Sequence, residues 1–153
     1  MIARVLMAVD DSHESLQAAR RAAPLAAGWG AAVRVLTVVG DHGVEQAIED
    51  VTGPGTGARR HREAEQLLAH VVRQVQMAGV RADAVTSVVR AGPPARRIVE
   101  EARAWPADLV VMAVSDRRGV RSPYVGSETE HVLEFAPCPV LVVPSPPVAD
   151  RQA

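Results

Sequence analysis

Two aspartates and a serine follow the first apolar run of the chain, in the segment Asp10-Asp11-Ser12. A carboxylate at the end of a buried strand could contact a ribose, the edge of a base or a metal ion. Helix capping by Asp11 or Ser12, with Glu14 near the third helical position, explains two of these residues without any ligand. Capping explains Asp10 less well, so Asp10 is the candidate binding residue of this segment.

The segment from Ala113 to Glu130 is the second place where the residue types could support binding. Ser127 followed by Glu130 forms a capping box, which predicts that Ser127 caps the last helix. The same helix N-terminus could instead bind an anion, and Gly126 would let a phosphate approach the backbone closely. Three arginines of this segment could neutralise a phosphate or could lie in solvent: Arg117, Arg118 and Arg121. The spacing alone leaves both interpretations open.

Nucleophilic catalysis has little support in the sequence. There is no Gly-x-Ser-x-Gly segment, and Cys138 lies between two prolines just before an apolar run, which favours a packing role. The five histidines are scattered without the spacing of metal ligands. We therefore do not expect an enzyme and assign no catalytic residue, and the metal ligands stay unknown.

Five short apolar runs are the predicted strands that must position these residues. The first, fourth and fifth are almost continuously apolar, which is typical of parallel strands buried on both faces. The third is more polar and suits the edge of a sheet. The runs are Ile2–Val9, Ala32–Val39, Ala84–Val89, Leu109–Val114 and Val140–Val143.

Four helical patterns alternate with these strands. The clearest runs from about Gly57 to Met77, with apolar residues at three-four spacing, and should end at Gly79. Pro24 should kink or shorten the first helix. The other three predicted helices are Ser12–Ala27, Pro94–Ala104 and Glu128–Phe135. This alternation predicts a single-domain α/β fold, an open five-stranded parallel sheet with helices on both faces.

The overall composition excludes several classes of protein. With 17 basic and 18 acidic residues the net charge is −1, which argues against a nucleic-acid-binding protein. The single cysteine excludes an internal disulfide and fits a reducing compartment. The uncharged stretch Ala22–Val33 is too short and broken to span a membrane, and the N-terminus lacks a signal-peptide pattern. We expect a cytoplasmic protein without nucleic-acid or membrane partners, with a surface excursion at Asp41–Thr56.

Three segments together resemble the universal stress protein family. They are VLMAVDDSHES at the first predicted strand, RAGPPARRIVEEARAWPADLVVMAV around the fourth, and VGSETEHVLEFAPCPVLVVP at the last helix and strand. The pair Gly126-Ser127 and the run Ala136–Val140 are especially typical of the family. The resemblance covers nearly the whole chain apart from Asp41–Thr56 and the C-terminal tail.

The resemblance implies a Rossmann-like sheet of order 3-2-1-4-5, similar to the adenine-nucleotide alpha-hydrolases. It implies a universal stress protein domain over residues 1–145, followed by a flexible tail at 146–153. Strand order then reverses between the first and fourth strands, where Asp10 and the segment Ala113–Ser127 meet. The resemblance also implies a homodimer in which Val140–Val143 of two copies cover each other, because an open apolar edge is a liability.

One branch of the family binds ATP through Gly-x-x-Gly, nine residues, then Gly-Ser or Gly-Thr. Gly126 and Ser127 match this motif, but Ala113 and Asp116 stand at the two leading glycine positions. A charge such as that of Asp116 at ~5 Å costs roughly 3 kcal/mol per unit of phosphate charge, at an effective dielectric of about 20. Glu128 would add to this repulsion.

Positive charge could offset this repulsion, either from nearby arginines or from a Mg²⁺ ion bound to Asp116. If a nucleotide binds, the resemblance implies that it is held by Val9, Asp10, Val38, Ala113, Asp116, Arg117, Gly126, Ser127, Glu128 and Thr129.

Two functions from different classes follow. The first is a non-catalytic stress-response regulator with a degenerate nucleotide-binding loop, which acts as a dimer on an unknown protein partner. The alternative is an ATP-binding switch, with Mg²⁺ and slow hydrolysis as options, that uses the crevice between the first and fourth strands. A third and weaker option is a site for another small anion. The sequence does not indicate the stress, the pathway or the partner.

Overall fold

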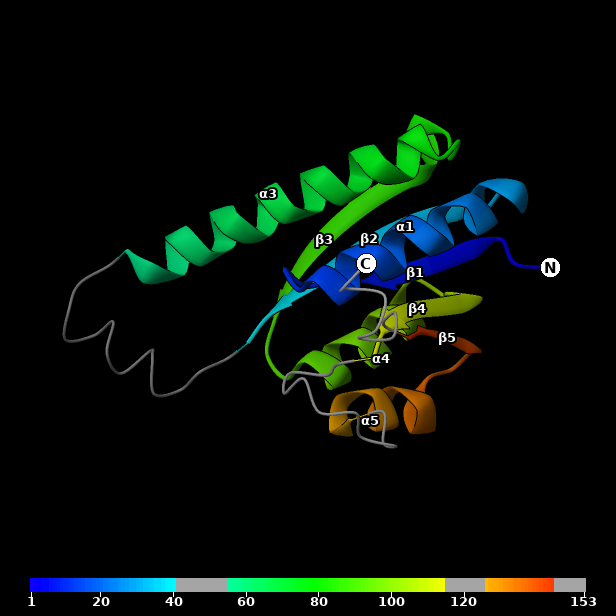
Figure 1. The fold of residues 1–153 in the computed structure, drawn as a ribbon. Coiled ribbons are helices and arrows are strands. Elements are labelled where there is room, and N and C mark those ends of the chain that lie inside the picture. Colours follow the sequence, from blue (N-terminus) through cyan, green and yellow to red (C-terminus); the bar gives the residue numbers. More distant parts are fainter. Residues whose placement is uncertain (41–54, 115–125, 145–153) are drawn as a thin grey trace, which may run out of the picture.

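The computed structural model describes residues 1–40, 55–114 and 126–144. They form three layers, with one parallel sheet between two pairs of helices (Figure 1). The sheet order is β3-β2-β1-β4-β5, so the predicted fold class and strand order are confirmed. The strands are β1 (Arg4–Ala8), β2 (Ala32–Val39), β3 (Val85–Ala91), β4 (Leu109–Ala113) and β5 (Val140–Val143).

The two central strands are apolar because helices cover both of their faces. Leu6 of β1 lies opposite Val110 of β4, and both side chains are buried. Side chains of β1 alternate between two cores, with Met7 facing one and Leu6 facing the other. The predicted edge strand β3 exposes Thr86 and Ser87, in agreement with its more polar sequence.

Two helices pack on each face of the sheet. One core lies between the sheet and the pair α1 and α3, and the other lies between the sheet and the pair α4 and α5 (Figure 1). No helix of the described residues is long and apolar enough to cross a membrane. The helices are α1 (His13–Gly28), α3 (Thr56–Met77), α4 (Pro94–Ala104) and α5 (Ser127–Phe135), with a short 3₁₀ helix η1 (Ala82–Ala84) before β3.

Pro24, predicted to kink or shorten the first helix, does not shorten it. The helix α1 continues through Pro24 to Gly28. Pro24 lies on the exposed side of the helix, where water can satisfy the carbonyl that loses its partner. Its neighbours Ala22, Ala23 and Ala26 are buried against the sheet, and this packing holds the helix on both sides of the proline.

The long helix α3 ends as the sequence predicts, in a glycine-dependent cap. Gly79 has φ +109°, and its N–H donates to the carbonyl of Gln76 at 3.0 Å. The N–H of Val80 donates to the carbonyl of Val75 at 3.3 Å, which completes the paired bonds of a Schellman motif. Of the predicted excursion at Asp41–Thr56, residues 41–54 lie outside the described residues, as does the predicted tail 146–153.

Asp108 joins the start of β4 to the start of β1. Its carboxylate Oδ2 accepts hydrogen bonds from the backbone N–H groups of Ala3 and Arg4, each at 2.9 Å. Its own N–H donates to the carbonyl of Arg4 at 2.9 Å. The two N–H groups bonded to the carboxylate hold the pKa of Asp108 below its usual value. The register of the two central strands is therefore fixed at their amino ends.

A buried ion cluster joins α4 to the strands β2 and β3. The carboxylate of Glu101 is buried and accepts hydrogen bonds from Arg34 Nη1 at 2.8 Å and from Arg90 Nε at 3.0 Å. The Arg34 guanidinium also lies over the Trp105 ring, 4.8 Å from its centroid. A buried carboxylate needs such partners to offset its lost hydration. This cluster fixes the position of α4 on the sheet.

Glu101→Gln should lower the free energy of unfolding by about 1–3 kcal/mol, because two charge-assisted hydrogen bonds at a buried site become weaker. The matched control is Glu100→Gln, the neighbouring residue of the same helix. Glu100 pairs with Arg96 at 3.1 Å and Arg97 at 2.6 Å in solvent, so its change should matter much less. Urea unfolding measures both, and equal losses would contradict the structural role of the cluster.

Candidate functional site

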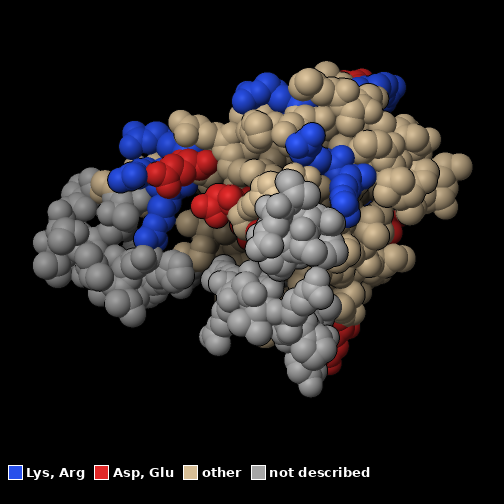
Figure 2. Space-filling model, viewed as in Figure 1, with Lys and Arg blue, Asp and Glu red and all other residues tan. Residues whose placement is uncertain are grey.

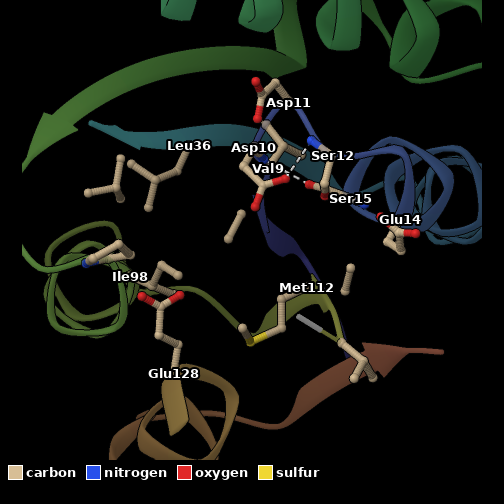
Figure 3. A pocket seen from close by; sticks show the side chains of 15 residues that line it. Val9, Asp10, Asp11, Ser12, Glu14, Ser15, Leu36, Ile98, Met112 and Glu128 are labelled. Atoms are coloured by element: carbon tan, nitrogen blue, oxygen red, sulfur yellow. Dashed lines mark hydrogen bonds between the residues drawn. The ribbon is translucent and has the colours of Figure 1, made fainter. Parts of the chain in front are cut away.

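A cavity of about 470 Å³ opens at the carboxyl ends of β1 and β4 (Figure 3). This is the point where strand order reverses, since the chain passes from β1 to β2 on one side while β4 lies on the other. Ligands bind at such points in open parallel sheets. The lining residues are Ala8, Val9, Asp10, Asp11, Ser12, Glu14, Ser15, Leu36, Val38, Pro94, Ile98, Met112, Ala113, Val114 and Glu128.

The acidic loop after β1 is held by a chain of short hydrogen bonds. Asp10 Oδ1 accepts from the N–H of Ser12 at 2.8 Å, and the Asp10 N–H donates to Ser15 Oγ at 2.8 Å (Figure 3). Ser12 is the N-cap of α1, and its Oγ accepts from the N–H of Ser15 at 3.2 Å. The expected capping role of Ser12 is thus confirmed. Asp10 also has a structural role, because it orders the turn that leads into the helix.

Apolar side chains from three elements form the walls of the cavity. Leu36 and Val38 come from β2, Met112 comes from β4, and Pro94 and Ile98 come from α4. A crevice of a few hundred cubic ångströms, with apolar walls and a few polar groups, is typical of a small-molecule site. Its apolar side chains suit an aromatic ring, while the loop after β1 supplies hydrogen-bond acceptors.

The first turn of α5 differs from the predicted capping box. Gly126 is the N-cap, Ser127 is the first helical residue, and no side chain caps the helix. The N–H of Glu130 instead donates to the carbonyl of Gly126 at 3.0 Å. Gly126 has φ +82°, a conformation that suits glycine, so the helix begins one residue earlier than predicted. Glu128 of this turn extends to the cavity.

The structure brings half of the predicted nucleotide-site residues together at the cavity. Five of them line it: Val9, Asp10, Val38, Ala113 and Glu128. Gly126, Ser127 and Thr129 lie nearby at the start of α5 but do not line it, while Asp116 and Arg117 lie outside the described residues.

Several residues that line the cavity are not among the predicted nucleotide-site residues. A signal existed for Leu36, because it lies two residues before Val38 and so points to the same face of β2. A signal also existed for Pro94 and Ile98, because α4 begins in a loop at the same edge of the sheet. No sequence signal pointed to Ser15, because its hydrogen bond with the Asp10 N–H forms only in the folded turn.

The described lining carries negative charge only. Four of its side chains are acidic, Asp10, Asp11, Glu14 and Glu128, and none is Lys, Arg or His. No group of three or more His, Cys, Asp or Glu side chains in the described ranges is arranged to hold a metal ion. These described carboxylates can accept hydrogen bonds from hydroxyl or amino groups, whereas they would repel an anion.

Comparison with known protein families shows to which family this chain belongs. The Universal stress protein family model matches residues 1–144. The chain belongs to the universal stress protein family. A universal stress protein of Methanocaldococcus jannaschii is 30% identical over 150 residues, which cover 94% of this chain and 82% of the relative. One of Thermus aquaticus is 32% identical over 143 residues, which cover 94% of this chain and 99% of the relative. The expected stress-response assignment is thus confirmed.

Solved universal stress proteins share the fold. One, crystallised in complex with cAMP, has a TM-score of 0.68 at 21% identity, covering 93% of this chain and 96% of its own. One from Archaeoglobus fulgidus, in complex with dAMP, has a TM-score of 0.65 at 22% identity, covering 93% of this chain and 97% of its own.

Thr129 of this universal stress protein carries a buried hydroxyl without a hydrogen-bond partner among the described residues. Thr129→Val should therefore raise the free energy of unfolding by about 1–2 kcal/mol, because it removes an unpaired buried polar group and keeps the shape. Thr129→Ser is the matched control, since it keeps the hydroxyl and loses a buried methyl, and it should lower stability. Thermal or urea unfolding decides the matter, and a loss of stability in both variants would contradict this account.

Proposed function

We propose that this universal stress protein is a non-catalytic stress-response regulator that binds an adenine nucleotide or nucleoside in the crevice between β1 and β4. The observation that carries the proposal is the cavity at the strand-order reversal, with apolar walls and a loop of hydrogen-bond acceptors. The complexes of two fold relatives with cAMP and dAMP support it. Ligand binding would report nucleotide status through the loops around the crevice.

The walls fit an adenine ring, and the carboxylates fit the ribose hydroxyls, which are hydrogen-bond donors. The fit to a triphosphate is poorer, because the described lining holds no cation and Ala113 adds a methyl group. ATP with Mg²⁺ would therefore depend on metal binding by carboxylates or on a contribution from Arg117, which lies outside the described residues. A regulator that works through protein contacts alone is the second candidate, and the acidic lining favours it.

Ala113→Leu should abolish nucleotide binding, since Ala113 lines the cavity and a larger side chain there would take up ligand space. The matched control is Ala104→Leu, which adds the same atoms at the exposed end of α4 and should leave binding intact. Calorimetry with AMP measures both variants. Binding that survives Ala113→Leu would place the ligand outside the crevice, and no binding by the unmodified protein would favour the second candidate.

We also propose a homodimer through β5. Among the described residues β5 pairs with β4 on one side only, and Val140, Leu141 and Val142 are partly exposed. The exposed Phe135 of the adjoining α5 adds apolar surface. A second β5 would pair the open backbone edge and cover these side chains.

Leu141→Arg should shift the protein from dimer to monomer, because it places a charge at the paired edge. Met77→Arg is the control, since Met77 is 87% exposed at the end of α3, which packs over β2 and β3 at the opposite edge of the sheet. Light scattering at micromolar concentration measures the mass, and circular dichroism checks the fold. A monomeric unmodified protein, or a dimer that tolerates Leu141→Arg, would contradict the proposed interface.

The regulator would act in the cytoplasm on a protein partner whose identity is unassigned, without nucleic-acid or membrane contacts. The surface charges support the expected lack of nucleic-acid contacts. Figure 2 shows arginines in several small groups, some next to acidic residues, on the face in view and over the described residues. The net charge of −1 agrees with it, because nucleic-acid-binding surfaces concentrate positive charge.

A further inference from the structure

Glu128 reaches into the crevice from the side opposite the loop after β1. Its side chain extends from the first turn of α5 toward Ile98, and Asp10 lies across the same space (Figure 3). The structure thus places carboxylates on two sides of the cavity, with the apolar walls between them. A ligand held against those walls would lie near both negative groups.

The N-terminus of α5 is poorly suited to bind a phosphate. A helix N-terminus carries a partial charge of about +0.5, which normally attracts an anion. The first turn of α5 already contains two carboxylates, Glu128 and Glu130. Glu128 lines the cavity and opposes the partial positive charge of the helix end there, whereas Glu130 is exposed to solvent, which screens its charge. A phosphate that approached Gly126 from the crevice would therefore meet the negative charge of Glu128.

We propose that Glu128 is a specificity residue that makes the crevice select adenosine over adenosine triphosphate. This inference rests on the proposed function and names the ligand class of that same site. A nucleoside places its base on the apolar walls and offers ribose hydroxyls, which donate to the carboxylates. A triphosphate brings up to four negative charges toward Glu128 and Asp10, with no cation in the described lining to offset them.

Calorimetric titrations with adenosine, AMP and ATP, each with and without Mg²⁺, test the proposed selectivity of the crevice. The unmodified protein should bind adenosine at least roughly tenfold more tightly than ATP, with AMP between them, because repulsion grows with ligand charge. Glu128→Gln should tighten ATP binding roughly tenfold and leave adenosine unchanged or slightly weaker. Added salt should narrow the gap between the two ligands in the unmodified protein, because it screens only the charged ligand.

Glu130→Gln is the matched control. Glu130 belongs to the same helical turn and has the same charge, but it is exposed and does not line the cavity. Its change should affect ATP binding much less than Glu128→Gln does. Circular dichroism of both variants checks that α5 remains folded.

Several outcomes would overturn the inference. If ATP binds the unmodified protein as tightly as adenosine, with or without Mg²⁺, the carboxylates do not exclude phosphate. If Glu128→Gln and Glu130→Gln have equal effects, the charge of the helix end decides the affinity and the position of Glu128 in the crevice does not. Binding of AMP without binding of adenosine would overturn this inference but keep the proposed function. No binding of any of the three ligands would overturn both.

Discussion

The pairing of β1 with β4 is the constraint on which the site depends. The chain that leaves β1 forms α1 on one face of the sheet, whereas α5, after β4, packs on the other face. The segments that follow these two strands lead to opposite faces of the sheet. Neither helix therefore covers the carboxyl ends of the strands, and a crevice remains between them. Asp108 fixes the pairing from the opposite end, where its carboxylate accepts hydrogen bonds from the backbone N–H groups of Ala3 and Arg4 at the start of the first strand.

One wall of the crevice depends on a buried ion cluster some distance from it. Pro94 and Ile98 line the cavity, and both belong to α4. The same helix is held on β2 and β3 by Glu101 through Arg34 and Arg90. Loss of this cluster would free α4 to shift and would change the width of the crevice. The stability of the fold and the shape of the site are thus coupled through one helix.

The sequence predicts most of the fold, because the central strands are almost continuously apolar and the helices repeat at three-four spacing. It also predicts the edge of the sheet at which the crevice lies, and residues such as Asp10 and Val38 follow from strand ends. It does not predict that Gly126 replaces Ser127 as the helix cap, because that choice depends on a positive φ angle. Nor does it distinguish buried Glu101 from exposed Glu100, since the partners of Glu101 come from distant strands.

The central claim is that the crevice between β1 and β4 is a site for an adenine ligand. A crystal structure of the protein grown with AMP tests it most directly. The account predicts that the adenine ring lies against Ile98 and Met112 and that the ribose lies within hydrogen-bond distance of Asp10 or Glu128. A ligand bound elsewhere on the protein, with the crevice closed by its own side chains, would contradict the account.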